Sequence, residues 1–215
     1  MAHEYSVTDS SILVDAPIIA LRRDRVVMPG GRQANREVME HFGAVAVVAL
    51  DEQGRVAVIE QYRRAVDKRL LELPAGILDI ADEDPLDCAK RELVEEAGLV
   101  ARTWSVLVDL VTSPGFSDEA VRVFLARDLT EVQRPAADDE EADLGFAWLG
   151  LDDAVRRVLA GEIVNSIAVG GILAAASVES GAAAARPKAA PFELRPWRLA
   201  ERRKAQGIGP DLKML

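Results

Sequence analysis

The stretch from Asp84 to Gly98, DPLDCAKRELVEEAG, constrains the fold of this chain more than any other segment. Asp84 is a favourable N-cap, Pro85 suits the first helical position, and Gly98 suits the position just past a helix end. Small and apolar side chains recur inside the stretch at helical spacing, so one face of this helix is expected to pack on a sheet. The residues of this stripe are Leu86, Ala89, Leu93 and Ala97.

Three glutamates, Glu92, Glu95 and Glu96, crowd the predicted helix beside its apolar stripe. Like charges three or four positions apart destabilise an isolated helix by roughly 0.2 to 0.5 kcal/mol per pair. A hard divalent cation such as Mg²⁺ would offset this repulsion, because it binds carboxylate, water and phosphate oxygens. Arg91 lies next to the glutamates and can hold one of them by bidentate hydrogen bonds. The pattern predicts a cation site, and an ordinary acidic face in contact with water is the alternative.

The composition is that of a folded, acidic chain. Its 215 residues suffice for one catalytic domain with small appended elements, and the formal net charge is -10. This charge argues against nucleic acid and against an anionic membrane as partners, since both select for clusters of Lys and Arg. The single cysteine, Cys88, allows no internal disulfide and is expected to be a small apolar filler of the helix.

The sequence favours a cytoplasmic location. The N-terminal MAHEYSVTDS lacks the basic start and the apolar run of a signal peptide. The most apolar stretch, Ile163 to Ala176, contains polar residues and glycines, and it is shorter than the roughly 20 residues that a transmembrane helix needs. We therefore expect no membrane contact.

Several short apolar runs bounded by turn residues are typical of β-strands. From Ser11 to Val38 such runs are broken by MPGG, which indicates a small antiparallel element of strand and hairpin. AVAVVAL and RVAVIEQYR are two further β-rich runs across the tight connection DEQG, and RLLELPAG is a short strand that ends at Pro74 and Gly76. After the helix, residues 103–111, 120–129 and 146–151 are expected to form strands.

The last third of the chain is expected to begin as helix and end as a tail. Residues 151–176 have helical periodicity and predict either one helix or two with a break at Gly161. The remainder is rich in Ala, Pro and Arg, so we expect a loosely packed or disordered tail with a short basic helix near Trp197 to Ala205. The chain thus divides into an N-terminal β element (1–40), a central domain (41–180) and a C-terminal tail (181–215).

Residues 76–99 resemble the Nudix box, whose core is a Glu, seven residues, then Arg-Glu-aliphatic-any-Glu-Glu-any-Gly-aliphatic. The matching residues are Glu83, Arg91, Glu92, Leu93, Glu95, Glu96, Gly98 and Leu99. The family places its first Gly six positions before the first Glu, whereas Gly76 lies seven before Glu83, so the loop here carries one extra residue. The resemblance implies an α/β (α+β) fold, an α/β/α sandwich around a mixed sheet, and cleavage of a nucleoside diphosphate linked to another moiety.

A second resemblance concerns the loop TSPGFSDE. Pro114 lies fifteen residues after Leu99, a spacing similar to the marker of the actinobacterial ADP-ribose pyrophosphatases, and SPGFSDE looks like their substrate loop. This likeness implies hydrolysis of ADP-ribose to AMP and ribose 5-phosphate by a metal-activated water, with Mg²⁺ as the cofactor and Mn²⁺ as its substitute. It also implies a homodimer in which the N-terminal β element is exchanged between subunits.

The same resemblance assigns roles to individual residues. Metal ligands would be Glu92, Glu96 and the backbone oxygen of Ala75, with Glu95 as a further ligand or a partner through water. Glu141 would be the general base, and adjacent Glu140 is the alternative. In the catalytic set Arg91 holds a carboxylate, while substrate contacts would come from Arg63 at the phosphates and from Pro114, Gly115 and Glu119 in the SPGFSDE loop.

Two other hypotheses remain open at this point. The enzyme could act on another nucleoside diphosphate derivative, such as a nucleoside diphosphate sugar, a dinucleotide or a dinucleoside polyphosphate. Alternatively the chain could be a non-catalytic sensor of ADP-ribose, although such a sensor has no need of the complete set of glutamates found here. The chain contains neither a P-loop nor a Gly-x-Gly-x-x-Gly pattern after a strand. His3 and His41 are isolated, so we assign them no catalytic role.

Overall fold

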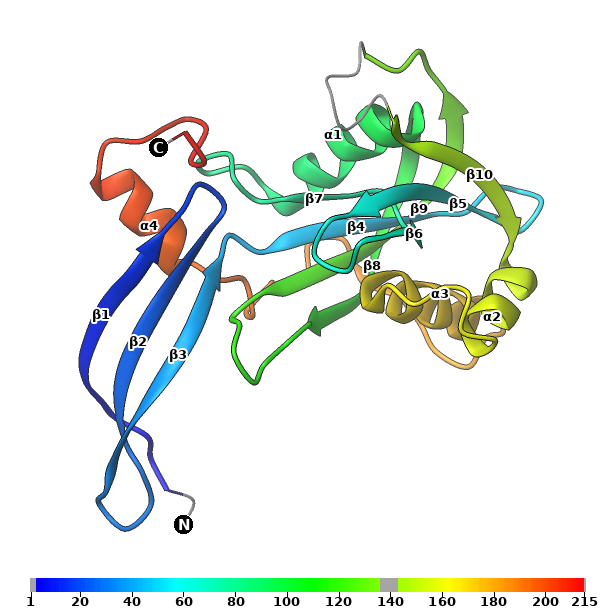
Figure 1. Ribbon diagram of the computed structural model, residues 1–215. Coiled ribbons are helices and arrows are strands. Elements are labelled where there is room, and N and C mark those ends of the chain that lie inside the picture. The colour runs from blue at the N-terminus through cyan, green and yellow to red at the C-terminus, as the bar shows by residue number, and fades with distance from the viewer. Residues whose placement is uncertain (1–2, 136–142, 215) are drawn as a thin grey trace.

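An antiparallel sheet of three strands is formed by the N-terminal part of the chain. The computed structural model describes residues 3–135 and 143–214. The strands of this sheet are β1 (Val7–Asp15), β2 (Ile19–Val27) and β3 (Gln33–His41), paired in that order. The sheet stands away from the body of the molecule, and its outer strand β1 is exposed along its whole length (Figure 1). The small N-terminal antiparallel element expected from the sequence is confirmed.

The body contains two further sheets. The larger has the order β11-β8-β9-β4-β7, and its strands are β4 (Ala44–Ala49), β7 (Ala75–Ile77), β8 (Leu99–Val111), β9 (Ala120–Glu131) and β11 (Arg186–Pro187). Because β4 pairs parallel with β9 and antiparallel with β7, this sheet is mixed. The smaller sheet has the order β10-β5-β6, formed by β5 (Arg55–Arg63), β6 (Lys68–Glu72) and β10 (Gly145–Gly150).

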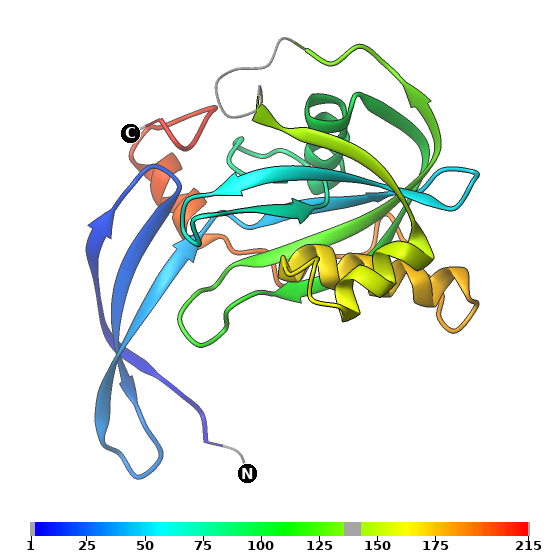
Figure 2. The same ribbon diagram turned by 45° about the vertical axis from the view of Figure 1, so that its right-hand side comes forward.

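Helices cover both faces of the central strands. Successive side chains of β4 point to opposite faces. Val45 and Val47 pack in one core cluster with Leu93 of α1 (Pro85–Ala97), whereas Ala46 and Val48 pack in the other with α3 (Ser166–Glu179). Helix α2 (Leu151–Leu159) lies beside α3, and both views show α1 on the side of the sheets opposite to this pair (Figures 1 and 2). The predicted α/β/α sandwich is confirmed. Of the two alternatives for residues 151–176, two helices with a break at Gly161 are present.

The turn DEQG does not join two neighbouring strands of one sheet. The turn itself is tight, with the Gly54 N–H donating to the Asp51 carbonyl at 3.1 Å. Beyond a single bridge between Leu50 and Val56, however, β4 and β5 separate into different sheets. The two β-rich runs expected across this tight connection are confirmed as strands. Their partners were not predicted, because β4 pairs with β7 and β9, and a local apolar pattern cannot identify such distant partners.

The expectation of a loosely packed C-terminal tail is wrong for residues 198–212. The predicted short helix is present as α4 (Arg198–Ala205), and its Leu199 is fully buried with Leu212, Ala20 and Phe42. Buried Arg203 donates from Nη2 to the carbonyl of Ala16 at 2.7 Å. The Ala, Pro and Arg composition suggested disorder because these partners lie far away in the sequence.

No helix in the described ranges, 3–135 and 143–214, combines the length and the apolar character needed to cross a membrane.

Candidate active site

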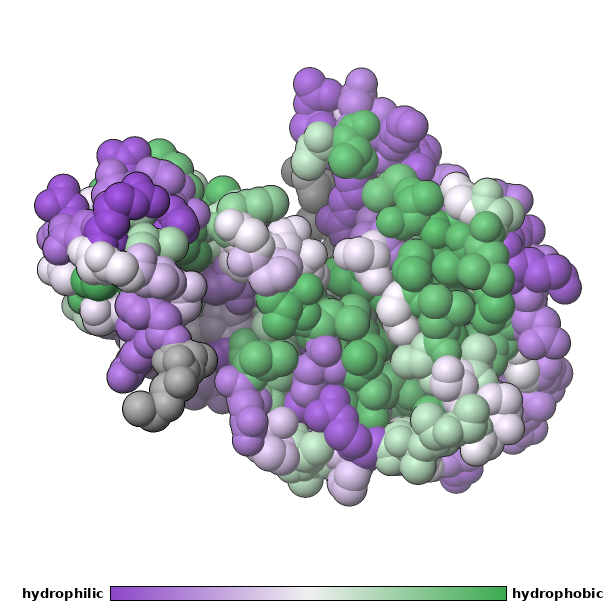
Figure 3. Space-filling model, turned by 90° about the horizontal axis from the view of Figure 1, so that it is seen from below, coloured by the Kyte–Doolittle hydropathy of each residue, from purple (hydrophilic) through white to green (hydrophobic). Residues whose placement is uncertain are grey.

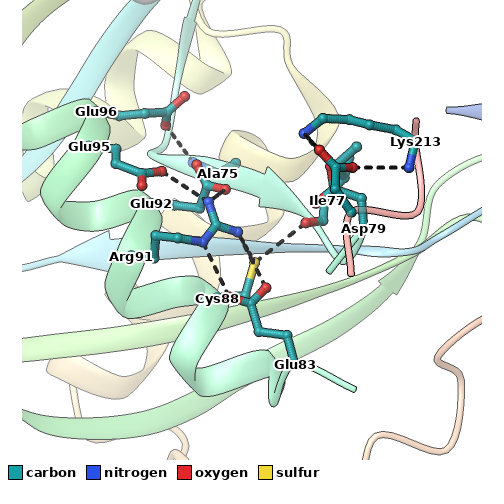
Figure 4. Close-up of polar contacts among 11 residues, drawn as sticks. Ala75, Ile77, Asp79, Glu83, Cys88, Arg91, Glu92, Glu95, Glu96 and Lys213 are labelled. Atoms are coloured by element: carbon teal, nitrogen blue, oxygen red, sulfur yellow. Dashed lines mark hydrogen bonds and ion pairs between the residues drawn. The ribbon is translucent and has the colours of Figure 1, made fainter. Parts of the chain in front are cut away.

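Helix α1 presents its glutamates to β7, and hydrogen bonds at both of its ends fix where the helix begins and stops. The Asp84 side chain caps the helix by accepting from the Leu86 N–H at 2.8 Å. At the other end Gly98 adopts a left-handed φ of 65°, and its N–H donates to the Val94 carbonyl at 3.0 Å. Buried Leu93 faces the sheet, so the glutamates beside it are directed toward the strand that carries Ala75 (Figure 4). Cys88 fills the same core cluster, as expected.

Glu96 is bound to the backbone of β7. Its Oε2 accepts a hydrogen bond from the Ala75 N–H at 2.8 Å, and the residue is only 7 % exposed. Burial raises the pKa of this carboxyl to about 8, although the bond from Ala75 opposes the shift. A buried carboxylate with so little compensation provides a strong site for a cation.

Glu92 lies against Gly76, the first glycine of the box. A Cβ added to Gly76 would lie 2.0 Å from Cδ of Glu92, so only glycine lets this carboxyl approach the strand. The Glu92 Oε1 accepts from Nη1 of Arg91 at 2.5 Å. Burial is the main reason that the pKa of Glu92 rises to about 7. The close approach of helix and strand thus depends on the absence of one side chain.

Arg91 explains how crowded carboxylates coexist in one helix. Besides Glu92, its guanidinium donates to Glu95 at 2.9 Å and to Glu83 at 3.2 and 3.3 Å (Figure 4). Glu83 reaches it although the loop before the helix contains one extra residue, a loop in which Asp82 adopts a left-handed φ of 62°. The arginine therefore contacts three glutamates of the box at once and offsets part of their negative charge.

Arg63 is the last residue of strand β5. Its Nε and Nη2 donate to the two carboxylate oxygens of Glu72 at 2.9 and 2.7 Å. The positive charge of Arg63 also acts to lower the pKa of Glu96, which places the guanidinium close to the metal-ligand candidates. The half-exposed Arg63 is positioned by buried Glu72, a partner that the sequence analysis missed. The sequence signal for Glu72 was its position directly before buried Leu73.

The SPGFSDE loop packs against β3. The Met39 N–H donates to the Phe116 carbonyl at 2.7 Å, and the Asp118 N–H donates to the Met39 carbonyl at 3.1 Å. Glu119 accepts from the Thr112 hydroxyl and lies 3.6 Å from Nδ1 of His41. Pro114 and Gly115 are exposed at the tip. The structure thus places this loop beside the N-terminal sheet, whereas the glutamates of α1 lie beside β7.

The two candidates for the general base, Glu140 and Glu141, lie outside the described residues. Asp143, which follows them, is bound to Nη1 of Arg69 at 2.7 Å. Pro135, which precedes them, lines a pocket together with Glu92 and Glu95.

This pocket has a volume of about 470 Å³, within the usual range for small-molecule sites. Its wall also includes Asp79, Asp211 and Lys213, which sequence reasoning missed. Lys213 gave no local signal, because it reaches the pocket only through the fold of the C-terminal segment.

The donor set fits a hard divalent cation. Glu96 is buried and Glu92 is partly buried on the same helix, and the backbone of Ala75 lies against Glu96. Within residues 3–135 and 143–214 no three His, Cys, Asp or Glu side chains are grouped as a ready-made metal cage. Magnesium does not need such a cage, since it commonly takes one or two carboxylates and completes its shell with water and phosphate oxygens.

The fold and the site define a helix–sheet–helix sandwich in which a glutamate-bearing helix packs against the strand that contains Gly76. Residues 40–167 match the family model of the NUDIX domain, and the chain belongs to this family.

Individual relatives agree with this assignment. The chain is 54% identical over 201 residues to the ADP-ribose pyrophosphatase of Mycobacterium tuberculosis, a match that covers 94% of this chain and 97% of the relative. It is 36% identical over 149 residues to the methanol dehydrogenase activator of Bacillus methanolicus, covering 69% and 80% of the two chains. The crystal structure of an ADP compounds hydrolase has the same fold, with a TM-score of 0.72 at 17% identity, covering 85% of this chain and 97% of that one.

Proposed function

We propose that this chain hydrolyses the pyrophosphate bond of ADP-ribose, giving AMP and ribose 5-phosphate, with Mg²⁺ as the preferred metal. The observation that carries the proposal is the 54% identity over nearly the whole chain to an ADP-ribose pyrophosphatase. The geometry supports it, because a pocket large enough for such a ligand opens beside the glutamates of α1.

Four residues of the box, together with Ala75, have a part in this proposal. Glu92, Glu96 and the backbone oxygen of Ala75 hold the cation, and Glu95 takes part directly or through water. When bound, the cation lowers the pKa of water and neutralises charge that develops on the phosphates. Arg91 keeps Glu92 and Glu95 in place through its hydrogen bonds to both.

Other residues handle the substrate and the proton. Arg63, held by Glu72, binds phosphate oxygens, and Pro114, Gly115 and Glu119 of the SPGFSDE loop contact the substrate. Glu141 accepts the proton of the attacking water, with Glu140 as the alternative.

The test is a substrate panel assayed with purified protein, with Mg²⁺, with Mn²⁺ and without metal. The panel contains ADP-ribose, a nucleoside diphosphate sugar such as GDP-mannose, a dinucleotide and a dinucleoside polyphosphate. We expect ADP-ribose to have the highest kcat/KM and activity to require a divalent cation. A higher kcat/KM for another member of the panel would contradict ADP-ribose as the preferred substrate but would still agree with a hydrolase of nucleoside diphosphate derivatives.

A regulatory role is the second candidate, because one relative carries the name of a methanol dehydrogenase activator. It predicts tight binding of ADP-ribose without turnover. The same panel, supplemented with a binding measurement by calorimetry, separates this role from hydrolysis.

We further propose that the chain forms a homodimer through exchange of the N-terminal β element. Strand β1 is exposed along its length and carries the apolar residues Val7, Ile12, Leu13 and Val14. Seen from the side of α2 and α3, apolar residues gather over a large part of the surface (Figure 3). A second copy would cover such surface, because monomers rarely expose large apolar patches. Light scattering coupled to size-exclusion chromatography tests this; a monomer mass at micromolar concentration would contradict it.

A further inference from the structure

The C-terminal residues 210–213 form one wall of the pocket beside the box glutamates. Pro210, Asp211 and Lys213 line it opposite Glu92 and Glu95 of α1. This contact joins parts of the chain that are more than a hundred residues apart, and the central Nudix match ends at residue 167. The wall is therefore an addition from outside the matched region.

The wall is held by backbone pairing. The Ala81 N–H donates to the Pro210 carbonyl and the Leu212 N–H to the Asp79 carbonyl, both at 2.8 Å. Between these bonds Asp211 forms an antiparallel bridge with Ile80. Side chains alternate along such a segment. Leu212 is buried at 1 % exposure, whereas neighbouring Lys213 faces the pocket.

Lys213 is the cation on the C-terminal wall of this pocket. Its Nζ lies 2.6 Å from Oδ2 of Asp79, whose side chain is buried, while the lysine side chain itself is 46% exposed (Figure 4). An ammonium has three N–H donors. Its next carboxylate, Asp211, is 3.8 Å away, beyond hydrogen-bonding distance. The group can therefore keep its bond to Asp79 and still donate to a ligand.

The acidic side chains that line the pocket favour a positively charged donor for a phosphate ligand. Its described lining includes four carboxylates, those of Asp79, Glu92, Glu95 and Asp211, and two cations, Arg91 and Lys213. Arg91 is occupied by the glutamates of the box, as its contacts with Glu83, Glu92 and Glu95 show. A diphosphate that enters this pocket meets mostly negative charge, so a second cation on the opposite wall would lower the repulsion.

We propose that Lys213 is a substrate-binding residue that donates a hydrogen bond to a phosphate oxygen of the nucleoside diphosphate, an inference that rests on the function proposed above. Lysine acts on phosphate as a point charge through charge-assisted hydrogen bonds. Because Lys213 contacts the ground state and the transition state alike, its loss should raise KM and leave kcat nearly unchanged.

The experiment compares three single variants and one double variant with the full-length wild type in the ADP-ribose assay. For Lys213→Met we expect KM to rise about tenfold and kcat to change less than about twofold. Lys213→Arg should restore most of the loss. The matched control is Lys204→Ala, because Lys204 also joins the C-terminal segment to this loop, through Asp82 at 2.7 Å, but does not line the pocket. It should keep KM within about twofold of the wild type.

A double variant separates binding from a purely structural role. Lys213→Met leaves Asp79 buried without its partner, so its Tm should fall, and Asp79→Asn combined with Lys213→Met should recover Tm. We expect KM of the double variant to stay about tenfold high. A wild-type KM in Lys213→Met, or its recovery in the double variant, would overturn the proposal. Absence of ADP-ribose turnover by the wild type would instead refute the proposed function.

Discussion

Glu96 and Ala75 are joined by a hydrogen bond of 2.8 Å from the Ala75 N–H to the carboxylate, which ties α1 to the short strand β7. The bond brings a buried carboxylate beside the backbone whose carbonyl is proposed to bind the same cation. Substitutions at Glu96 can therefore separate the hydrogen bond from the charge.

Glu96→Gln should leave the fold intact and reduce kcat/KM by about 100-fold or more, since a cation ligand loses its charge. The glutamine oxygen can still accept from Ala75, so the metal-free Tm should not fall. The Tm increase caused by Mg²⁺ should shrink at the same time, because a ligand stabilises only through the state that binds it. Glu52→Gln, in an exposed turn, is the control. Near-normal turnover by Glu96→Gln would contradict the metal assignment.

The effect of Mg²⁺ on stability should depend on pH. Burial raises the pKa of Glu92 to about 7 and of Glu96 to about 8, above the value of 4.5 that both have when unfolded. The folded state therefore holds these protons more tightly, and the metal-free protein loses stability progressively as the pH rises from about 4.5 to about 8. Mg²⁺ binds the ionised carboxylates, so its Tm increase should grow between pH 6 and pH 8.5. Melting curves with Mg²⁺ or with a chelator measure this; an increase independent of pH would be the contrary result.

Gly76→Ala should inactivate more than it unfolds. The new Cβ would lie 2.0 Å from Cδ and Oε1 of Glu92, so this side chain has to swing away from β7. Because the displaced atoms are the end of a flexible side chain, we expect a stability loss of about 1 kcal/mol or less but a fall in kcat/KM of about tenfold or more. Gly150→Ala is the matched control, since a Cβ there meets nothing within 4 Å. Equal activity of the two variants would rule out the proposed role of Gly76.

Glu141→Gln should lower kcat about 100-fold or more, the usual effect of removing a general base, while Glu140→Gln should change kcat by less than about threefold. Tm is measured for both variants to separate a loss of chemistry from a loss of stability. Single-turnover rates are the appropriate measurement. The reverse ranking would assign the base to Glu140, and wild-type rates in both would remove this loop from the chemistry.

Arg203→Ala should destabilise the protein by about 2 to 4 kcal/mol, because a buried cation that binds the carbonyl of Ala16 and the carboxylate of Asp15 is lost. Urea denaturation gives the free energy of unfolding. Arg198→Ala, an exposed residue of the same helix, should stay within about 0.5 kcal/mol of the wild type. A similar value for Arg203→Ala would mean that α4 does not anchor the N-terminal sheet.

Local signals explain which parts of the fold were predictable. The ends of α1 were readable because Asp84 and Gly98 act on their own neighbours, and the strands were readable from apolar runs. The partners of β4 were not, since β7 and β9 lie far along the chain. The packing of residues 198–213 was missed for the same reason.

The site divides in the same way. Glu92 and Glu96 follow from the spacing of the box, and the sequence indicated their neighbours Arg91 and Gly76. Asp79 and Lys213 face the same pocket only because a C-terminal bridge to Ile80 brings them there. No pattern within a window of twenty residues contains that information.

The contact between Arg203 and Ala16 also bears on how the chain is made, because the two residues are 187 positions apart. During synthesis β1, β2 and β3 emerge first, yet the helix that anchors them emerges near the end. Contacts of such long sequence separation form late and slow the completion of folding. The N-terminal sheet therefore gains its contacts with α4 only after residues 198–205 have been made, and the pocket wall that carries Lys213 forms later still.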